Sequence, residues 1–415
     1  MEQKKRVPKR RFKGFVDEWS QQKVGEIGNF YYGGGTPKTG KDEYWGGDLP
    51  WIQSSDISEN ILYVNEPKKT ITEAGLKNSA TKLVPANSIA IVTRVGVGKL
   101  ALIPYDYSTS QDFLSISDLN VDSWFGTYVM YKLLQKERKA VQGTSIKGVT
   151  KDDLLSMRVM IPNELEEQKM IGLFLKKLDE TITLQQRKLE KTKEIKSAYL
   201  AEMFPAEGER VPKRRFAGFT GEWEERKFGD LGCFGKTYSY SRANEGVGDY
   251  YHIHYGDIHA RFDGLIKKTT KIPSLKVEGN YETLNNGDIV IADASEDYKD
   301  LGKTVVIEET DKRKIIAGLH TFKFTPNKYM NSLFYLYYSQ SNLFKKFSYK
   351  TGTGISVFGI SKENINKMKL DVPSYIEQQK IGEFFKKLDD LIASHQRKLE
   401  KLQALKQAYL HEMFV

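Results

Sequence analysis

The sequence predicts an α+β fold: two mixed α/β domains separated by two long antiparallel coiled-coil helices, arranged as a circular pseudo-twofold repeat. The main observation is a long segment that occurs twice, at residues 167–204 and 377–414, with 23 of 38 positions identical. A shorter segment also occurs twice, at residues 6–19 and 210–223, with 11 of 14 positions identical. Internal repeats of this kind determine the architecture before single elements are assigned.

Composition limits the class of protein. A chain of 415 residues is long enough for about two or three domains. Its formal charge of +10 favours a polyanionic partner, although a basic soluble protein without one would look the same. Cys233 is the only cysteine, which excludes an internal disulfide and favours a reducing compartment. No run approaches the ~18 apolar residues of a membrane helix, and the N-terminus lacks the apolar core of a secretory signal. We expect a cytoplasmic protein.

The two long repeats have the start signals of helices. Each follows a proline and opens with a capping-box pattern, Asn163 with Glu166 in the first copy and Ser374 with Glu377 in the second. In such a box the first side chain accepts a free backbone N–H, and the glutamate reaches back. Both repeats lack proline after this point, so we predict two uninterrupted helices.

Apolar residues recur along both repeats at heptad spacing, which predicts a coiled coil. The core positions we assign are Leu175, Leu178, Ile182 and Leu189 in the first copy, and Phe385, Leu388, Ile392, Leu399 and Leu402 in the second. Polar residues interrupt the series and could fix its register; they are Gln185, Thr192, Lys196, His395 and Lys406. The simplest partner of each helix is the other helix, although an intermolecular coiled coil would satisfy the same pattern.

Length and order suggest a function for these helices. A helix of about 40 residues is ~60 Å long, whereas one turn of B-DNA spans ~34 Å. Two domains held by such a rod would contact sites about one turn apart, with unread base pairs between them. Joining Val415 to Met1 would make the repeat continuous, so we expect the two chain ends to lie near each other.

The short repeats, which we call the straps (residues 6–19 and 210–223), carry basic clusters. The residues are Lys9, Arg10 and Arg11 in the first strap, and Lys213, Arg214 and Arg215 in the second. They could contact DNA phosphates. They could equally belong to a solvated strap that is held in place by Phe12, Phe15 and Trp19.

The remaining sequence forms two globular parts on the same plan. Four segments result: 1–161, with the first strap and domain; 162–205, the first helix; 206–372, with the second strap and domain; and 373–415, the second helix. In the first domain, strands are predicted at Ile89–Thr93 and Leu100–Ile103 and a helix at Trp124–Lys139. The two domains share a frame but differ in detail far more than the helices do. This contrast favours two recognition domains with different targets, although loops also diverge faster than helices.

No catalytic motif was found. The Gly96–Lys99 segment is too short for a phosphate-binding loop and lacks the following Ser or Thr. There is no Asn-Pro-Pro-Tyr motif, no glycine-rich loop suited to S-adenosylmethionine and no nuclease-like carboxylate cluster. The best metal candidate, His252, His254, Asp257 and His259, matches no familiar ligand spacing. A nucleic-acid contact or a polar strand end explains these residues better, so we expect no metal and no catalysis by this chain.

Several motifs together resemble the specificity subunit of type I restriction–modification systems. They are the straps ending in Trp19 and Trp223, the Gly34–Pro37 loop, the Tyr44–Asp48 run, Asp56-Ile57, the helix starts after Pro162 and Pro373, and the Lys-Leu-Asp segments at 177–179 and 387–389. The resemblance covers essentially the whole chain. The second half lacks the first half's Gly-Gly-Thr-Pro loop and Trp-Gly-Gly run, so the halves are expected to recognise different sequences.

The resemblance implies that each globular part is a target-recognition domain for one half of a split, asymmetric site in double-stranded DNA. The helices would set the spacer and dock two methyltransferase subunits, which methylate adenine. Restriction subunits would add translocation and cleavage. S-adenosylmethionine, ATP and Mg would then be bound by partner subunits and no cofactor by this chain. Two other classes stay open: a free-standing enzyme, and a coiled-coil DNA-binding scaffold or regulator unrelated to restriction.

Candidate base-reading residues lie where the sequence patterns of the two domains match but the side chains differ in type. They are Gln53, Ser54, Ser55, Thr93, Arg94, Gln111 and Lys147 in the first domain, and His254, Tyr255, Asp293, His320 and Ser356 in the second. In this alignment Gln111 lies opposite His320. A bidentate contact is possible from Arg94 to guanine and from Gln111 to adenine.

Overall fold

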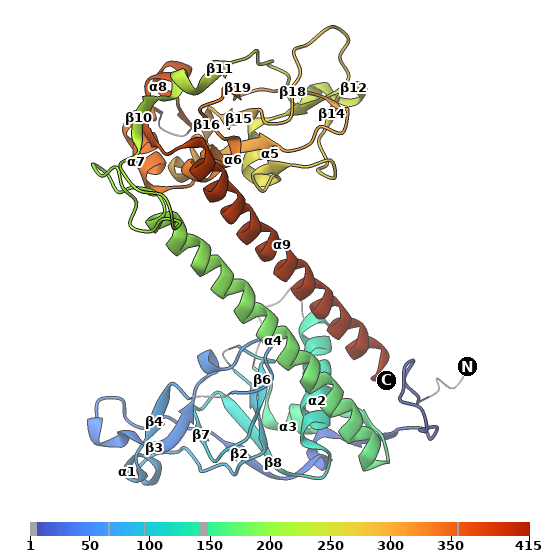
Figure 1. The fold of residues 1–415 in the computed structure, drawn as a ribbon. Coiled ribbons are helices and arrows are strands. Elements are labelled where there is room, and N and C mark those ends of the chain that lie inside the picture. The colour runs from blue at the N-terminus through green and yellow to red at the C-terminus, as the bar shows by residue number, and fades with distance from the viewer. Residues whose placement is uncertain (1–5, 65–66, 95, 141–147, 355–356) are drawn as a thin grey trace. The chain divides into compact units, whose positions relative to one another are not determined.

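The computed structural model describes residues 6–64, 67–94, 96–140, 148–354 and 357–415 (Figure 1). It divides into two compact units, residues 1–187 with 396–415, and residues 188–395. The division passes through both long helices, α4 (Leu165–Glu202) and α9 (Tyr375–Glu412). Each long helix therefore contributes one portion to each unit.

The first unit contains three sheets. Its strands are β1 (Ser20–Lys23), β2 (Gly28–Gly33), β3 (Trp45–Ile52), β4 (Lys69–Ile71), β5 (Ser88–Val92), β6 (Leu100–Ile103), β7 (Ser108–Thr109), β8 (Phe113–Leu119) and β9 (Arg158–Ile161). Its helices besides α4 are α1 (Glu73–Lys77), α2 (Ser123–Ala140) and α3 (Lys151–Ser156). The main sheet has the order β2-β8-β5-β6, and a second sheet has the order β4-β3-β7. The strands and the helix predicted from the sequence in this region are confirmed.

The second unit repeats this plan. Its strands are β10 (Glu224–Lys227), β11 (Gly232–Phe234), β12 (Glu245–Ile253), β13 (Leu265–Ile266), β14 (Ser274–Leu275), β15 (Ile289–Ala292), β16 (Ala294–Ser295), β17 (Thr304–Ile307), β18 (Lys314–Ala317), β19 (Thr321–Pro326), β20 (Phe358–Gly359) and β21 (Lys369–Val372). Its helices besides α9 are α5 (Tyr255–Ala260), α6 (Ser332–Tyr338), α7 (Asn342–Thr351) and α8 (Lys362–Lys367). The sheet order β11-β19-β15-β17-β13 corresponds to the main sheet of the first unit, and β14-β12-β18 to its second sheet.

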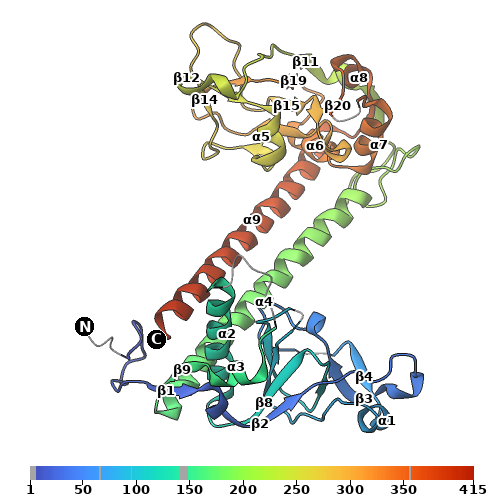
Figure 2. The same cartoon turned by 180° about the vertical axis from the view of Figure 1, so that it is seen from behind.

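A two-stranded ribbon connects each strap to the start of a long helix. In the first unit β1, just after the strap, pairs antiparallel with β9, just before α4. In the second unit β10 pairs antiparallel with β21, just before α9. Figure 2 shows the first of these ribbons beside the base of α4. The strap therefore lies close to the N-terminal end of the helix that follows its own domain.

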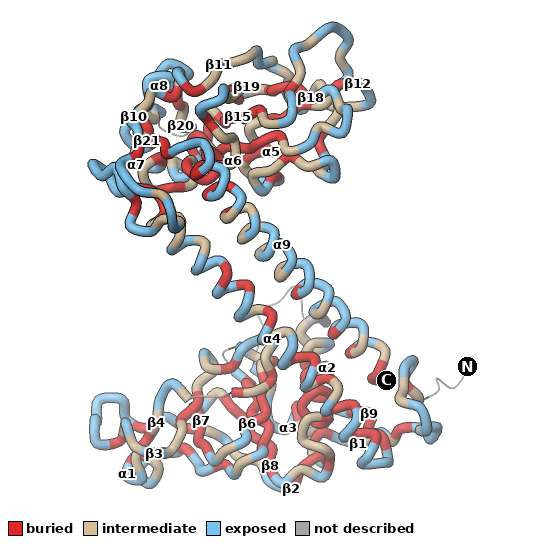
Figure 3. Tube along the Cα trace, in the orientation of Figure 1, coloured by how far each residue is buried: buried red, intermediate tan, exposed pale blue. Residues whose placement is uncertain are grey.

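Each globular core is completed by the end of the helix from the other half of the chain. In the first unit Phe414 stacks on Phe125 at 5.6 Å between ring centroids and meets Trp19 edge-on at 6.2 Å. In the second unit Phe204 meets Trp223 edge-on, also at 6.2 Å. All five of these aromatic side chains are buried, as is much of the interior of each unit (Figure 3). Trp19 is thus a packing residue, as one reading of the strap predicted.

The long helices pack antiparallel within each unit. In the first unit Phe174 of α4 meets Tyr409 of α9 at 4.7 Å between ring centroids. In the second unit Tyr199 of α4 meets Phe384 of α9 at 4.9 Å. The predicted coiled-coil core positions are buried or half-buried: Leu175, Leu178, Ile182, Leu189, Phe385, Leu388, Ile392, Leu399 and Leu402. Along both helices buried and exposed positions alternate, as the tube in Figure 3 shows.

The predicted caps need a correction. Ser374 does accept the backbone N–H of Glu377, at 3.4 Å, but Asn163 does not cap α4. Its side chain instead contacts Ser20 and donates to the carbonyl of Glu18. Because α4 begins at Leu165 and α9 at Tyr375, the residue equivalent to Ser374 is Glu164.

The chain ends meet as the circular repeat predicted. In the first unit the backbone N–H of Arg10 donates to the carbonyl of Glu412, 2.9 Å away. In the second unit Arg214 makes the same bond to Glu202, also at 2.9 Å. The first strap therefore binds the end of α9 in the way that the second strap binds the end of α4. No helix in the described ranges is both long and apolar enough to cross a bilayer.

The second arginine of each strap forms a buried ion pair. Arg11 binds both carboxylate oxygens of Glu167 at 2.6 and 2.8 Å, and their side chains are 10% and 1% exposed. Arg215 binds Glu377 with the same two distances. Each glutamate lies in the first turn of a long helix. It cannot reach back in a capping box because it is held by the strap.

We expect Arg11→Ala to destabilise the first unit by roughly 3–5 kcal/mol, because it leaves the buried Glu167 carboxylate without its partner. The matched control is Arg10→Ala, which removes an exposed pair to Glu412 and should have a much smaller effect. Urea unfolding of the two variants, followed by far-ultraviolet circular dichroism, makes the comparison. Equal midpoints would show that Glu167 is hydrated rather than buried.

Candidate nucleic-acid interface

Both units present a short turn at the end of an equivalent strand. In the first unit β3 ends at Ile52, and Gln53 precedes a 3-10 turn, Ser54–Asp56, whose Asp56 carboxylate accepts the N–H of Gln53 at 3.0 Å. In the second unit β12 ends at Ile253, and His254 caps α5. Residues 52–57 (Ile-Gln-Ser-Ser-Asp-Ile) and 253–258 (Ile-His-Tyr-Gly-Asp-Ile) therefore occupy equivalent positions in the two units. We call residues 53–56 and 254–257 the recognition turns.

A loop lies beside each recognition turn, residues 110–112 in the first unit and 318–320 in the second. In the first unit the N–H of Ser110 donates to Ile52, and the N–H of Thr93 donates to Asp112 at 2.7 Å. In the second unit the N–H of Gly318 donates to Ile253, and the N–H of Asp293 donates to His320 at 3.1 Å. Backbone hydrogen bonds thus bring the strand end, the recognition turn and the 110–112 or 318–320 loop together in both units.

The register corrects one part of the sequence alignment. Val92 pairs with Phe113 in the first unit, and Ala292 pairs with Thr321 in the second. The residue that corresponds to His320 is therefore Asp112 and not Gln111, which corresponds to Leu319. The strands around these loops share few identical residues, so the sequence left the alignment free to shift by one.

In the second unit the described candidates form a single cluster. The ring of Tyr255 lies 4.7 Å from that of His254 and 5.3 Å, edge-on, from that of His320. His320 Nδ1 lies 3.2 Å from the carboxylate of Asp293, and the His320 backbone is in the left-handed region with φ of 54°. Burial raises the pKa of the Asp293 carboxyl. The cluster offers imidazole, phenol and carboxylate groups, all of which can contact base edges or phosphates.

The first-unit candidates are more exposed and more polar. Ser55, Arg94 and Gln111 are exposed, and Gln53 and Ser54 are half-buried. The Thr93 side chain is nearly buried, and its hydroxyl donates to the carbonyl of Asp112. The Thr36 hydroxyl donates to the amide oxygen of Gln111, which links the Gly-Gly-Thr-Pro loop to the 110–112 loop. Lys147 of this set, and Ser356 of the second, lie outside the described residues.

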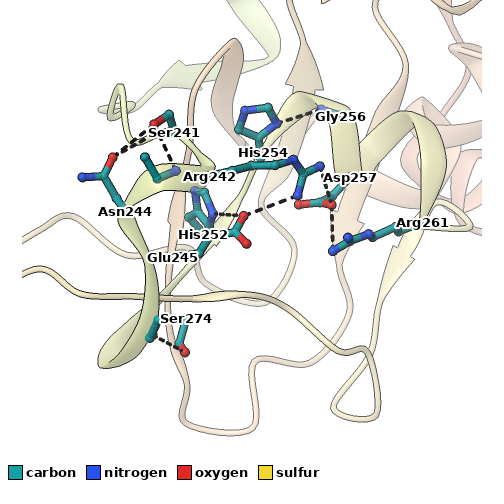
Figure 4. Close-up of polar contacts among 12 residues, drawn as sticks. Ser241, Arg242, Asn244, Glu245, His252, His254, Gly256, Asp257, Arg261 and Ser274 are labelled. Carbon is teal, nitrogen blue, oxygen red and sulfur yellow. Dashed lines mark hydrogen bonds and ion pairs between the residues drawn. The ribbon is translucent and has the colours of Figure 1, made fainter.

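A charged network beneath the second recognition turn was missed from the sequence (Figure 4). Asp257 is fully buried, and its Oδ1 accepts from Arg242 at 3.1 Å and forms an ion pair with Arg261 at 3.2 Å. Arg242 also contacts Glu245, which lies 3.3 Å from His252 Nε2. The two guanidinium groups keep about half of their surface exposed while the buried carboxylate fixes them. Such pre-positioned arginines suit bidentate contact to guanine or phosphate.

The first unit has a simpler version of this network. The side chain of Asp56, at the position of Asp257, is buried, and its carboxylate lies 3.5 Å from the exposed Lys68 ammonium. The shared Asp-Ile pair in each turn was visible in the sequence. Two of its charged partners were not, because Lys68 and Arg242 come from other segments and occupy different positions relative to the turn, whereas Arg261 lies four residues after Asp257.

The histidines of the second unit point to different partners. His254 Nδ1 accepts the N–H of Gly256 at 3.0 Å, His252 Nε2 faces Glu245, and His259 Nε2 donates to the carbonyl of Ala294 at 2.9 Å. Throughout the part of the chain that the structure describes, no group of three or more His, Cys, Asp or Glu side chains is placed to hold a metal ion. His252 and Asp257 thus lie in the charged network, whereas His254 and His259 each bond to the backbone.

The strap arginines are engaged within the chain. Arg10, Arg11, Arg214 and Arg215 each form an ion pair with a glutamate of a long helix. Their geometry favours the packing interpretation of the straps. Lys9 and Lys213 remain exposed, and phosphate contact by the strap cations stays a prediction.

The chain matches one protein family along most of its length. The family model described as the type I restriction modification DNA specificity domain matches twice, over residues 16–194 and 220–404. The chain belongs to this family. Each match contains one recognition turn and most of one long helix, so the family repeat coincides with the internal repeat.

Individual relatives agree with this assignment over part of their length. The type I restriction enzyme MjaIX specificity subunit of Methanocaldococcus jannaschii is 30% identical over 174 residues, which are 40% of this chain and 39% of that protein. The EcoR124I/EcoR124II specificity subunit of Escherichia coli is 33% identical over 174 residues, 39% of this chain and 41% of that protein. These alignments thus span about two fifths of each relative.

A solved structure agrees over the whole chain. The S subunit of a type I restriction–modification system from M. genitalium covers 99% of this chain and 99% of its own, with a TM-score of 0.63 at 15% sequence identity. At that identity the likeness shows a shared fold. The predicted fold class, including the circular repeat of recognition domain and long helix, is confirmed for this specificity-domain protein.

We expect the second unit to lose stability when the pH falls below about 6.5, the ordinary pKa of histidine. Burial lowers the pKa of both His252 and His254 in the folded chain, so the unfolded chain binds protons more readily just below that value. The stability contributed by the neutral imidazoles is therefore present above pH 6.5 and decreases on acidification.

Thermal unfolding between pH 5 and 8 measures this dependence, and His252→Asn is the test variant. It should weaken the decrease relative to the natural chain. His395→Asn, which alters a histidine of α9 outside this cluster, is the control. A pH profile unchanged by His252→Asn would contradict the assignment.

Proposed function

We propose that this chain is the DNA-specificity subunit of a type I restriction–modification complex. Each recognition domain would bind one half of a split, asymmetric site in double-stranded DNA. The observation that carries the proposal is the pair of recognition turns: they occupy equivalent positions on a duplicated frame, but one presents Gln-Ser-Ser and the other His-Tyr-Gly. A conserved frame with changed surface chemistry suits two half-sites of different sequence.

The helices supply the second part of the proposal. Together they would set the number of unread base pairs between the half-sites and dock two methyltransferase subunits. Restriction subunits, with translocase and nuclease activity, would join the same complex. The chain itself would be non-catalytic and hold no cofactor, while its partners would bind S-adenosylmethionine, ATP and Mg. The net charge of +10 supports a polyanionic ligand.

Methylation sequencing of cells that express this chain with its methyltransferase partner tests the proposal. We expect a split motif with one methylated adenine in each half, and no methylation when either protein is absent. Methylation by the chain alone would overturn the non-catalytic role. A continuous methylated motif would overturn the assignment of one half-site to each domain.

We predict that Arg94→Ala relaxes the choice of base at one position of the first half-site. The exposed guanidinium at the end of β5 is suited to a bidentate guanine contact, and loss of one such contact costs about 1–3 kcal/mol of discrimination. The second half-site should be unchanged. Methylation of a plasmid library randomised in both half-sites provides the measurement.

The matched control is Lys9→Ala, which removes an exposed strap cation. It should lower binding to all sequences alike and reduce the salt dependence of binding. If Arg94→Ala gave this uniform loss instead, Arg94 would be a phosphate contact and not a base-reading residue.

A further inference from the structure

A buried triad of Asp, Lys and Tyr joins three elements in the first unit. Asp179 of α4 and Lys406 of α9 lie 2.6 Å apart, and each side chain is 6% exposed. Tyr128 of α2 donates its hydroxyl to the other carboxylate oxygen of Asp179 at 2.8 Å. The Lys406 ammonium also donates to the carbonyl of Asn60 and lies over the ring of Tyr131. The recognition domain, its own helix and the helix from the other half therefore meet at one point.

The second unit contains the same triad. Asp389 of α9 and Lys196 of α4 lie 2.7 Å apart, with side chains 29% and 17% exposed, so this pair is half-buried. Tyr337 of α6 donates to the other oxygen of Asp389 at 3.0 Å. Lys196 also donates to the amide oxygen of Gln340. The two lysines were noted in the sequence only as interruptions of the heptads. Their partners could not be identified there, because each pair joins residues about 200 positions apart.

We expect such ion pairs to select the register of the two helices more than to stabilise the fold. A buried ion pair is often no more stabilising than two apolar side chains of similar volume, because both charges lose their hydration. A polar residue buried in a coiled coil does select one register and orientation, because every other register leaves it without a partner.

The sequence around the triads penalises a shift of register. If one helix slid by a heptad, Lys406 would meet Gly172 or Gln186 in place of Asp179. Lys196 would likewise meet a glycine or a glutamine. Every such slip leaves an ammonium group without its carboxylate, buried in the first unit and half-buried in the second. A slip of one heptad is ~10 Å, close to the rise of about three base pairs of DNA.

We propose that the two triads are positioning residues that fix the length of the unread DNA spacer. Each holds one recognition domain to a single register of the helix pair through its tyrosine. The inference rests on the proposed DNA-specificity function, and it adds the residues that set the length of the unread spacer. It assigns no base contact to the triads, so the two half-site sequences should not depend on them.

The main test replaces both ion pairs by leucines, with Asp179→Leu and Lys406→Leu in the first unit and Asp389→Leu and Lys196→Leu in the second. The complex with its methyltransferase is given a plasmid library whose half-sites are separated by spacers from three base pairs shorter to three longer than the natural one. We expect unchanged half-sites, and methylation at non-natural spacers raised about tenfold or more, since no slip now buries an unpaired charge. A spacer preference as narrow as in the natural chain would overturn the proposal.

A charge exchange keeps the test decisive if the leucine variant does not fold. Asp179→Lys alone and Lys406→Asp alone should each reduce methylation at every spacer, whereas the two together should recover part of the methylation at the natural spacer, since an aspartate at 406 lacks the Asn60 and Tyr131 contacts of the lysine. Failure of the exchange to recover any of it would overturn the proposal. The control changes an exposed pair on the same helix, Lys176→Gln with Glu180→Gln, and should leave the spacer unchanged.

The natural chain in the same assay separates this inference from the proposed function. If the natural complex methylates no split motif, the proposed function fails. If it methylates a split motif with one spacer and the triad variants do the same, the function stands and only the role of the triads is refuted.

Discussion

The structure depends on cores that neither half of the chain completes alone. Trp19 in the first strap packs against Phe414 at the end of α9, and Trp223 packs against Phe204 at the end of α4. Burial of such aromatic side chains is the largest contribution that single residues make to a core. Because each globular part needs the last turn of the opposite helix, the helices must run antiparallel and the repeat must close into a circle.

On this shared frame the two recognition turns are free to differ. Their positions are set by backbone hydrogen bonds to neighbouring strands, which do not depend on side-chain identity. The side chains of Ser55 and Tyr255, which carry no cap, can therefore differ without disturbing the frame, whereas His254 also caps α5. Beneath each turn a buried aspartate is retained, while its cationic partners differ, Lys68 in one unit and Arg242 with Arg261 in the other. Both units thus share the aspartate of the turn, and they differ in the cations that bind it.

The features that could be predicted from the sequence are those that follow from its internal repeat. The similarity of the long segments, with 23 of 38 positions identical, was enough for the helices, their antiparallel packing and the meeting of the chain ends. Contacts between dissimilar residues far apart in the chain were not visible, such as Lys406 with Asp179 or Arg242 with Asp257. Alignments failed by one residue where identity was low, as with Gln111 in place of Asp112 and Asn163 in place of Glu164. In these places only hydrogen-bond register decides the correspondence.

The position of Phe414 in the first core has a consequence for synthesis on the ribosome. The first unit is translated up to residue 187 early, but it lacks the aromatic ring that stacks on Phe125 until 227 further residues have been added. At typical elongation rates this interval is roughly eleven to forty-five seconds. The second unit uses only residues 188–395 and can close its core sooner. The domain that is made first is therefore the last to finish folding, and its unfilled core is the surface that a nascent-chain chaperone would meet.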